Sequence, residues 1–279
     1  MAAYTKLSIL TGEEQGDILT AYLSDFPFES FDYEKGMLNA YIQQAELAEC
    51  REDIEALLYD EGVLDFFFED IEQQNWNAVW ESNFKEVEVK NRVLIRAPFH
   101  EARPDYKGLE IIIQPKMSFG TGHHATTQLM VEAMLTLDLK DKRVLDMGSG
   151  TGVLAIVAAK LGAESVLAVE IDDMAEESVR ENIVLNEVCD RVESVWGDAK
   201  AIEGRKFDIV LANINRNILL ADMKAYGATL SAGGVLVISG FLEEDVASLT
   251  RKAKSLGMKK IQHRKCEEWQ AVEFLKIKN

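Results

Sequence analysis

From residue 143 onward, short apolar runs alternate with segments whose apolar residues recur at helical spacing. Short apolar runs are typical of buried strands, and a spacing of three or four residues is typical of helices that cover a sheet. This alternation predicts an α/β fold, a mostly parallel sheet with helices on both faces. The predicted strands are 143–147, 165–170, 192–196, 207–212 and 234–239, and the predicted helices are 152–161, 173–186, 217–230 and 243–256. Two later β segments, 259–266 and 270–277, indicate an antiparallel edge.

The first 73 residues predict a small α+β domain. Its expected strands are 4–10 and 63–69, its expected helices are 12–24 and 50–60, and an aromatic cluster occupies 26–33. The block 73–88 then places Trp76, Val79, Trp80 and Phe84 on one helical face, a stripe that is typical of packing. We therefore expect three parts: a domain 1–73, a linker helix 74–88 and a second domain 89–279.

The second domain begins with two strand-like runs, 93–95 and 109–113. The unusual block FGTGHHATT follows at 119–127, and an apolar helix is expected over 129–137. Two adjacent histidines in a glycine-rich loop raise the question of a metal, but no cysteine or further histidine lies at ligand spacing. His123 and His124 are interpreted as residues that shape the loop or line the pocket, with a proton-acceptor role for one of them as the alternative.

Composition excludes several classes of protein. The chain has 279 residues, 47% of them apolar, and a formal net charge of −18 with acids spread along its length. Such a charge disfavours direct binding of nucleic acid and favours a basic partner, or simply keeps the protein soluble. Three scattered cysteines fit a reducing cytosol, and no run of apolar residues is long enough to span a membrane. We expect a cytoplasmic protein with no metal and no membrane contact, acting as a monomer.

A glycine-rich turn follows the strand at 143–147. Gly148, Gly150 and Gly152 alternate with other residues, and a helix is expected to begin at once. Glycine lets the backbone turn sharply and approach a ligand, and the helix N-terminus favours a negative group. A dinucleotide fingerprint would need glycine at 153, where valine stands. The spacing, with Asp146 two residues earlier, resembles that of the S-adenosyl-L-methionine loop of class I methyltransferases.

Three polar residues follow later strands at the same edge of the predicted sheet, where ligands of open α/β sheets bind. Glu170 can accept hydrogen bonds from both ribose hydroxyls, whereas Asp172 is equally well a helix N-cap. Asp198 can accept from an adenine amine or simply form a turn. Asn213 offers an amide that both donates and accepts, which suits the orientation of a nucleophilic amine.

Taken together, FGTGHHATT and LDMGSGTGVLAI resemble one family, the bacterial methyltransferases that modify large-subunit ribosomal protein eleven. NWNAVWESNFKEV, DIVLANI and EEWQAVEF extend the resemblance through most of the chain. It implies a class I, Rossmann-like catalytic domain, an N-terminal substrate-recognition domain and a helical linker. It also implies methyl transfer to lysine side-chain amines and to the N-terminal α-amine of that basic protein. Carried onto this sequence, the resemblance assigns the cofactor to Thr127, Gly148, Glu170 and Asn213, with Gly150 in the same loop, and lets Phe119 and Thr121 shape the methyl-transfer pocket.

The chain departs from the family pattern at three places. Glu170 stands where the family usually has aspartate, and either carboxylate can hold a ribose diol. The run after Asn213 is Ile-Asn-Arg-Asn-Ile-Leu, which makes Asn215 and Asn217 further candidates on the acceptor side. Phe99 and His100 replace a tryptophan that is often found there.

Three other functions agree less well with the sequence. A methyltransferase of nucleic-acid bases would be expected to carry an Asn/Asp-Pro-Pro-aromatic run after residue 212 and a basic groove, and the sequence shows neither. A nicotinamide-dependent dehydrogenase disagrees with the glycine spacing. A non-catalytic ribosome-assembly module that retains the cofactor disagrees with an intact Asn213 and a complete FGTGHHATT block.

Overall fold

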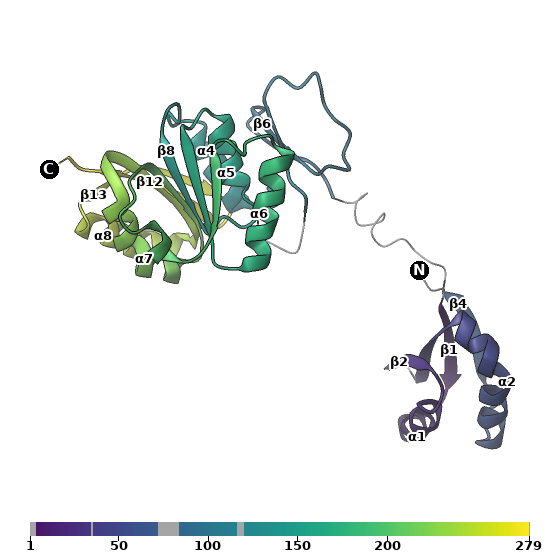
Figure 1. Cartoon of the computed structure of the whole chain (residues 1–279). Coiled ribbons are helices and arrows are strands. Elements are labelled where there is room, and N and C mark those ends of the chain that lie inside the picture. The colour runs from purple at the N-terminus through teal and green to yellow at the C-terminus, as the bar shows by residue number, and fades with distance from the viewer. Residues whose placement is uncertain (1–3, 35, 72–83, 116–119, 279) are drawn as a thin grey trace. The chain divides into compact units, whose positions relative to one another are not determined.

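The computed structural model describes residues 4–34, 36–71, 84–115 and 120–278. The chain forms two compact units, Met1–Asn83 and Phe84–Asn279. Both are visible in Figure 1, the first in purple and the second in teal to yellow.

The first unit is a four-stranded antiparallel sheet with two helices. The strand order is β2-β3-β1-β4. Both helices bury their apolar residues in one core with Leu7, Ile9 and Ile42 of the sheet, so both lie on the same face. The elements are β1 (Tyr4–Leu10), α1 (Glu13–Leu23), β2 (Phe28–Glu34), β3 (Met37–Gln43), α2 (Gln44–Asp60) and β4 (Phe66–Ile71).

The second unit is built on a seven-stranded sheet of order β10-β9-β8-β11-β12-β14-β13. The first five of these strands are parallel, and β14 and β13 are antiparallel at one edge. A three-stranded sheet, β5-β6-β7, precedes it in the chain. The strands are β5 (Val87–Val89), β6 (Val93–Arg96), β7 (Leu109–Ile112), β8 (Arg143–Met147), β9 (Ser165–Glu170), β10 (Val192–Trp196), β11 (Phe207–Asn213), β12 (Leu230–Leu242), β13 (Met258–Cys266) and β14 (Trp269–Lys276).

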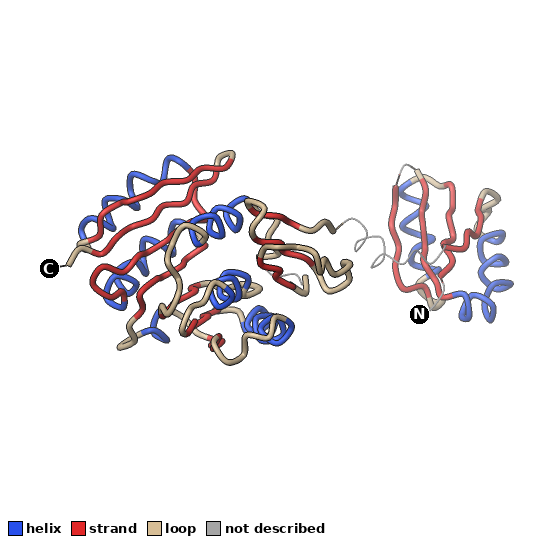
Figure 2. The backbone as a smooth tube through the Cα atoms, turned by 90° about the horizontal axis from the view of Figure 1, so that it is seen from above, coloured by secondary structure: helices blue, strands red, loops and turns tan. Residues whose placement is uncertain are grey.

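Helices cover both faces of this sheet (Figure 2). Alternate residues of each strand face opposite sides, so Val144 joins the core under α4, α5 and α6, and Leu145 joins the core under α7 and α8. The longer helices are α4 (Ala125–Met134), α5 (Val153–Lys160), α6 (Asp173–Leu185), α7 (Arg216–Thr229) and α8 (Val246–Ser255), with short 3₁₀ turns η1 (Ala199–Ile202) and η2 (Glu243–Asp245).

The architecture predicted from the alternating pattern is confirmed, and three details are corrected. The linker helix expected over 74–88 lies mostly on residues 72–83, outside those described, and its described end is loop followed by β5. Strands β2 and β3 are not among the predicted strands: 26–33 is interpreted as an aromatic cluster, whereas Phe28–Glu34 and Met37–Gln43 pair as antiparallel strands. Helix α4 begins at Ala125 instead of 129, because His124 caps it by accepting a hydrogen bond from the Thr126 amide.

Candidate active site

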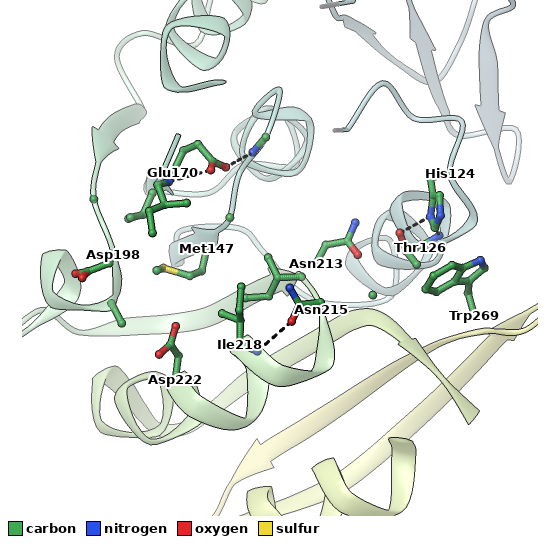
Figure 3. Close-up of a pocket in the computed structure, with 18 residues that line it drawn as sticks. His124, Thr126, Met147, Glu170, Asp198, Asn213, Asn215, Ile218, Asp222 and Trp269 are labelled. Carbon is green, nitrogen blue, oxygen red and sulfur yellow. Dashed lines mark hydrogen bonds between the residues drawn. The ribbon is translucent and has the colours of Figure 1, made fainter. Parts of the chain in front are cut away.

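A cavity of about 400 Å³ opens at the carboxyl ends of β8, β9 and β11 (Figure 3). The strand order reverses between β8 and β11, which is where open α/β sheets bind their ligands. The volume lies in the range of small-molecule sites. Of the residues expected to hold the cofactor, Gly148, Gly150, Glu170, Asp198 and Asn213 all line this cavity.

The glycine loop forms its floor. Gly148, Gly150 and Gly152 have φ values of +72°, +57° and +79°, a backbone region that residues with a side chain rarely adopt. A Cβ atom on Gly148 would lie 2.4 Å from Cγ2 of Ile214, which follows β11. The glycine at 148 is therefore required twice, for its backbone conformation and for the approach of the β11–α7 turn.

Asp146 lies beneath this loop with a fully buried carboxyl group. Its Oδ2 accepts a hydrogen bond from the Ala155 amide at 3.0 Å, which joins strand β8 to the first turn of α5. Its Oδ1 has no hydrogen-bond partner among the described residues. Burial raises the pKa of Asp146 to about 7, and the charge of Glu170 adds to the rise.

Glu170 ends β9 and is the carboxylate at one end of the cavity. Its Oε2 accepts from the Gly150 amide at 2.8 Å, and its Oε1 accepts from the amides of Ile171 and Asp172 at 2.9 and 3.2 Å. Two carboxylate oxygens offer about four lone pairs, so three bonds leave acceptor capacity for a ligand. Asp172 instead caps α6, accepting from the Met174 and Ala175 amides.

Beyond Glu170 the cavity is lined by apolar and acidic side chains. Ile171 and Ile218 line it although their side chains are 72% and 44% exposed, which indicates a surface that an apolar ligand can cover. Asp198 accepts from the Lys200 amide at 2.8 Å and so caps η1. Asp222 on α7 lines the cavity as well, and burial raises the pKa of its carboxyl group.

Asn213 ends β11 on the other side of the glycine loop. Its Oδ1 is buried and has no hydrogen-bond partner among the described residues, although it lines the cavity. Buried polar atoms are nearly always paired, so this oxygen indicates a position for a donor of a ligand. Asn215 also lines the cavity, but its Oδ1 caps α7 by accepting from the Ile218 amide. Asn217 is not among the described residues that line it.

Two aromatic side chains, His124 and Trp269, lie near Asn213 (Figure 3): His124 was expected to shape its loop or line the pocket, whereas the sequence did not indicate Trp269. His124 and Trp269 both line the cavity, with ring centroids 4.7 Å apart and planes at 66°. His124 precedes α4, and its Nδ1 lies 2.8 Å from the Thr126 hydroxyl. Trp269 begins β14, far along the chain, and reaches the site because β14 lies next to β12.

Two further predicted residues, Thr121 and Thr127, are not among the described residues that line the cavity. Thr127 lies in the first turn of α4 with a buried hydroxyl that has no partner within the described chain. The Thr121 hydroxyl oxygen lies 3.2 Å from Nδ1 of His123. Nε2 of His123 lies 2.7 Å from the Lys85 carbonyl oxygen, so this histidine links its loop to the first residues of the second unit. Phe119 lies outside the described residues.

One hydrogen bond links this loop to the glycine loop. The Thr151 hydroxyl donates to the Gly120 carbonyl at 2.7 Å. A Cβ on Gly120 would lie 2.6 Å from the Thr151 hydroxyl oxygen, so the two loops approach each other closely.

Comparison with known proteins agrees with this geometry. The family model described as Ribosomal protein L11 methyltransferase (PrmA) matches residues 13–276. The chain belongs to this family. Among its curated relatives, the ribosomal protein L11 methyltransferase of Porphyromonas gingivalis is 45% identical over 271 residues, covering 95% of this chain and 92% of the relative. That of Phocaeicola vulgatus is 40% identical over 267 residues, covering 94% of each chain.

A solved structure extends the comparison to the fold of this PrmA-family protein. The ribosomal protein L11 methylase of Lactobacillus delbrueckii subsp. bulgaricus matches with a TM-score of 0.64 and 26% identity, covering 70% of this chain and 99% of that one. The resemblance drawn from FGTGHHATT and the glycine loop is confirmed, as is the class I methyltransferase fold.

Within the described ranges, no group of three histidine, cysteine or acidic side chains is arranged to hold a metal ion. Nor is any described helix long and apolar enough to cross a bilayer.

Proposed function

We propose that this protein transfers methyl groups from S-adenosyl-L-methionine to amines of ribosomal protein L11, on lysine side chains and on the N-terminal α-amine. The observation that carries the proposal is one cavity lined by both the Glu170 carboxylate and Asn213, whose amide oxygen has no partner among the described residues. Family membership supports both the reaction and the substrate.

The residues of the cavity fit the cofactor. Glu170 has acceptor capacity for the ribose hydroxyls, and Asp198 lies where an adenine amine can be accepted. The backbone at Gly148 and Gly150 can come close to the methionine part, because neither residue has a side chain. When bound, the cofactor supplies a methyl group on a positively charged sulfur.

The chain itself must prepare the acceptor amine. A lysine amine with a pKa near 10.4 is neutral in only about one part in a few thousand at pH 7, which costs about 4–5 kcal/mol. Burial against Trp269 and His124 favours the neutral form, because desolvation disfavours a charge. The Asn213 carbonyl oxygen then accepts an N–H of the amine and directs its lone pair toward the methyl group.

We extend the proposal to the residues that do not line the cavity. Thr127 offers a buried hydroxyl with no partner among the described residues, and we propose that it contacts the cofactor. We propose that Phe119 and Thr121, from the FGTGHHATT block, shape the methyl-transfer pocket. We also propose that residues 1–73 recognise the substrate, that 74–88 connect the domains, and that the protein works as a cytoplasmic monomer without binding nucleic acid.

The test uses the intact protein, S-adenosyl-L-methionine with a labelled methyl group, and L11 purified from cells that lack methylation of it. Intact-mass and peptide mass spectrometry then locate the label. Label on lysines and the α-amine of L11 is expected. Label only on another ribosomal protein would reject L11 as the substrate. Cofactor binding without transfer to any ribosomal protein would reject the catalytic proposal.

A further inference from the structure

Two buried asparagines of α6 hold the chain as it leaves β7. Asn182 and Asn186 are 0% and 4% exposed and lie one helical turn apart, so both point to the same side of the helix. Oδ1 of Asn186 accepts from the Ile112 amide at 2.9 Å, and its Nδ2 donates to the Ile112 carbonyl oxygen at 2.6 Å. Oδ1 of Asn182 accepts from the Gln114 amide at 2.8 Å. The two side chains therefore bind alternate residues of one segment.

These side-chain amides take the place of a neighbouring strand. β7 is an edge strand of the β5-β6-β7 sheet, and just after it the Ile113 amide donates to the Arg96 carbonyl oxygen on β6 at 2.9 Å. The amides of residues 112 and 114 point the opposite way, where the two asparagines accept them. Buried backbone groups are nearly always paired, so this segment depends on α6 for its position. The chain that leads to the FGTGHHATT block is thus fixed to α6.

Asn182 also reaches the glycine loop, which Asn186 does not. Its Nδ2 donates to the Thr151 carbonyl oxygen at 2.9 Å. Thr151 is fully buried between Gly150 and Gly152, and its hydroxyl donates to the Gly120 carbonyl oxygen at 2.7 Å. A chain of hydrogen bonds therefore runs from the segment after β7, through Asn182 and Thr151, to the loop that begins at Gly120.

Helix α6 is joined to the proposed ribose site as well. Glu170 accepts from the Gly150 amide in the glycine loop and from the Asp172 amide, and Asp172 caps α6. The glycine loop also packs directly on the helix, because a Cβ on Gly152 would lie 2.8 Å from Cγ1 of Val179. Packed interiors transmit a displacement from one element to the next. A shift of the glycine loop or of Glu170 on ligand binding is thereby passed to the Asn182–Thr151 pair.

The other end of this chain of hydrogen bonds lies beside the cavity. His124, which lines the cavity, follows Gly120 by four residues. The loop between them is also held against β6, because a Cβ on Gly122 would lie 2.9 Å from Cδ1 of Ile95. The Thr151 hydroxyl is the printed hydrogen bond that holds this loop to the glycine loop. Methyl transfer in line depends on alignment, and a displacement of about 1 Å can cost about 100-fold in rate.

We propose that Asn182 and Thr151 are positioning residues for methyl transfer. They hold residues 120–124 against the glycine loop, so that a bound cofactor fixes the wall of the cavity that faces the acceptor amine. Neither residue is among the described residues that line the cavity, so both act through the loops that they join. This proposal rests on the proposed function and adds to it the residues that align its two halves.

The first experiment compares Asn182→Ala with the matched variant Asn186→Ala. Both substitutions remove a buried amide of α6 that holds the segment after β7, and both should lower the thermal midpoint. Only Asn182→Ala also disconnects the glycine loop. It should lower kcat for methylation of L11 about tenfold or more, whereas Asn186→Ala should lower kcat less than about threefold. Cofactor Kd should change less than about threefold in both variants, because neither side chain lines the cavity.

A milder pair of variants guards against a failure to fold. Thr151→Val removes the hydroxyl that bonds Gly120 and keeps the shape of the side chain, so kcat should fall about tenfold at a similar cofactor Kd. Thr151→Ser restores a hydroxyl, so its kcat should return to within about threefold of the wild-type value. Falls in kcat that are equal in the Asn182 and Asn186 variants, or a serine variant as slow as the valine variant, would show a merely structural role and overturn the proposal.

A second readout does not depend on methylation. Hydrogen–deuterium exchange of amides in residues 120–124 is measured with and without S-adenosyl-L-homocysteine, and exchange in residues 150–155 verifies that the ligand is bound. The ligand should slow exchange in 120–124 in the wild type and in Asn186→Ala, but much less in Thr151→Val. Equal protection in all three proteins would overturn the proposal. A wild-type protein that shows this pattern and yet methylates no ribosomal protein would contradict the proposed function and still support the link between the two loops.

Discussion

Glu170 has two tasks, and the substitution Glu170→Gln separates its charge from its shape. The carboxylate accepts three backbone amides, from Gly150 on one oxygen and from Ile171 and Asp172 on the other. Glutamine has one carbonyl oxygen, so its NH₂ group must face at least one of these amides. A buried donor left without an acceptor costs about 1–3 kcal/mol, so the free energy of unfolding should fall by that amount.

Cofactor binding should fall as well. A hydrogen bond from a ribose hydroxyl to a charged carboxylate contributes about 1.5–3 kcal/mol, which corresponds to a Kd raised about 10- to 150-fold. Glu170→Asp keeps the charge and shortens the side chain by one methylene group. It should raise Kd by less than about tenfold, less than the loss of one such bond.

Isothermal titration of S-adenosyl-L-methionine into the wild-type protein and both variants measures these changes. Chemical denaturation of the same samples gives the free energy of unfolding. A glutamine variant that binds the cofactor as tightly as the wild type would refute the ribose assignment. Equal losses in both variants would show that the position of the carboxylate matters and its charge does not.

Three further substitutions test other parts of the site. Asn213→Ala should lower kcat at least about tenfold while changing cofactor affinity little, because it removes an acceptor for the amine. Steady-state kinetics with L11 measure kcat, and titration measures cofactor affinity. Equal losses in kcat and cofactor affinity would argue against the role assigned to Asn213. Gly148→Ala should destabilise the protein by about 2–5 kcal/mol, because alanine disfavours a φ of +72° and its Cβ would meet Ile214. The control Gly204→Ala has a similar φ of +74° but an open surrounding, so denaturation should reveal only about 1–2 kcal/mol there. Asp146 has a pKa near 7 in the folded state, above its unfolded value of about 3.9, so the folded state binds the proton more tightly. The free energy of unfolding should therefore fall as pH rises between these two values, by at most about 1.4 kcal/mol per pH unit. Asp146→Asn should flatten this slope in denaturation curves at pH 5, 6 and 7, and an unchanged slope would mean that another group titrates.

The sequence predicts those parts of the site that local pattern determines. Glycines after a buried strand and an acid at the end of the next strand are local signals, and Gly148 and Glu170 do line one cavity. Trp269 could not be placed in that way, because its position depends on β14 inserting between β12 and β13, a pairing of residues distant in sequence. Asp222 is similar, since helical spacing cannot tell which acid of α7 faces the cavity.

Local pattern also misplaces the ends and pairing of some elements. The apolar stretch after 128 predicts a helix start that is four residues late, because a histidine is a less usual N-cap than serine or aspartate. The strand at Met37–Gln43 alternates as a half-buried strand should, yet the preceding aromatic residues hide the hairpin that it forms with β2.

The antiparallel edge of the large sheet has a consequence for the behaviour of the protein at high concentration. Strand β13 leaves one row of backbone groups without a neighbouring strand in the sheet, and such edges invite pairing with another chain. Its exposed positions include Lys259, Lys260 and Lys265, and a register shift interrupts its pairing between Lys260 and Gln262. Two β13 strands brought edge to edge would place these lysines against each other. The edge of the catalytic unit is thereby protected from aggregation.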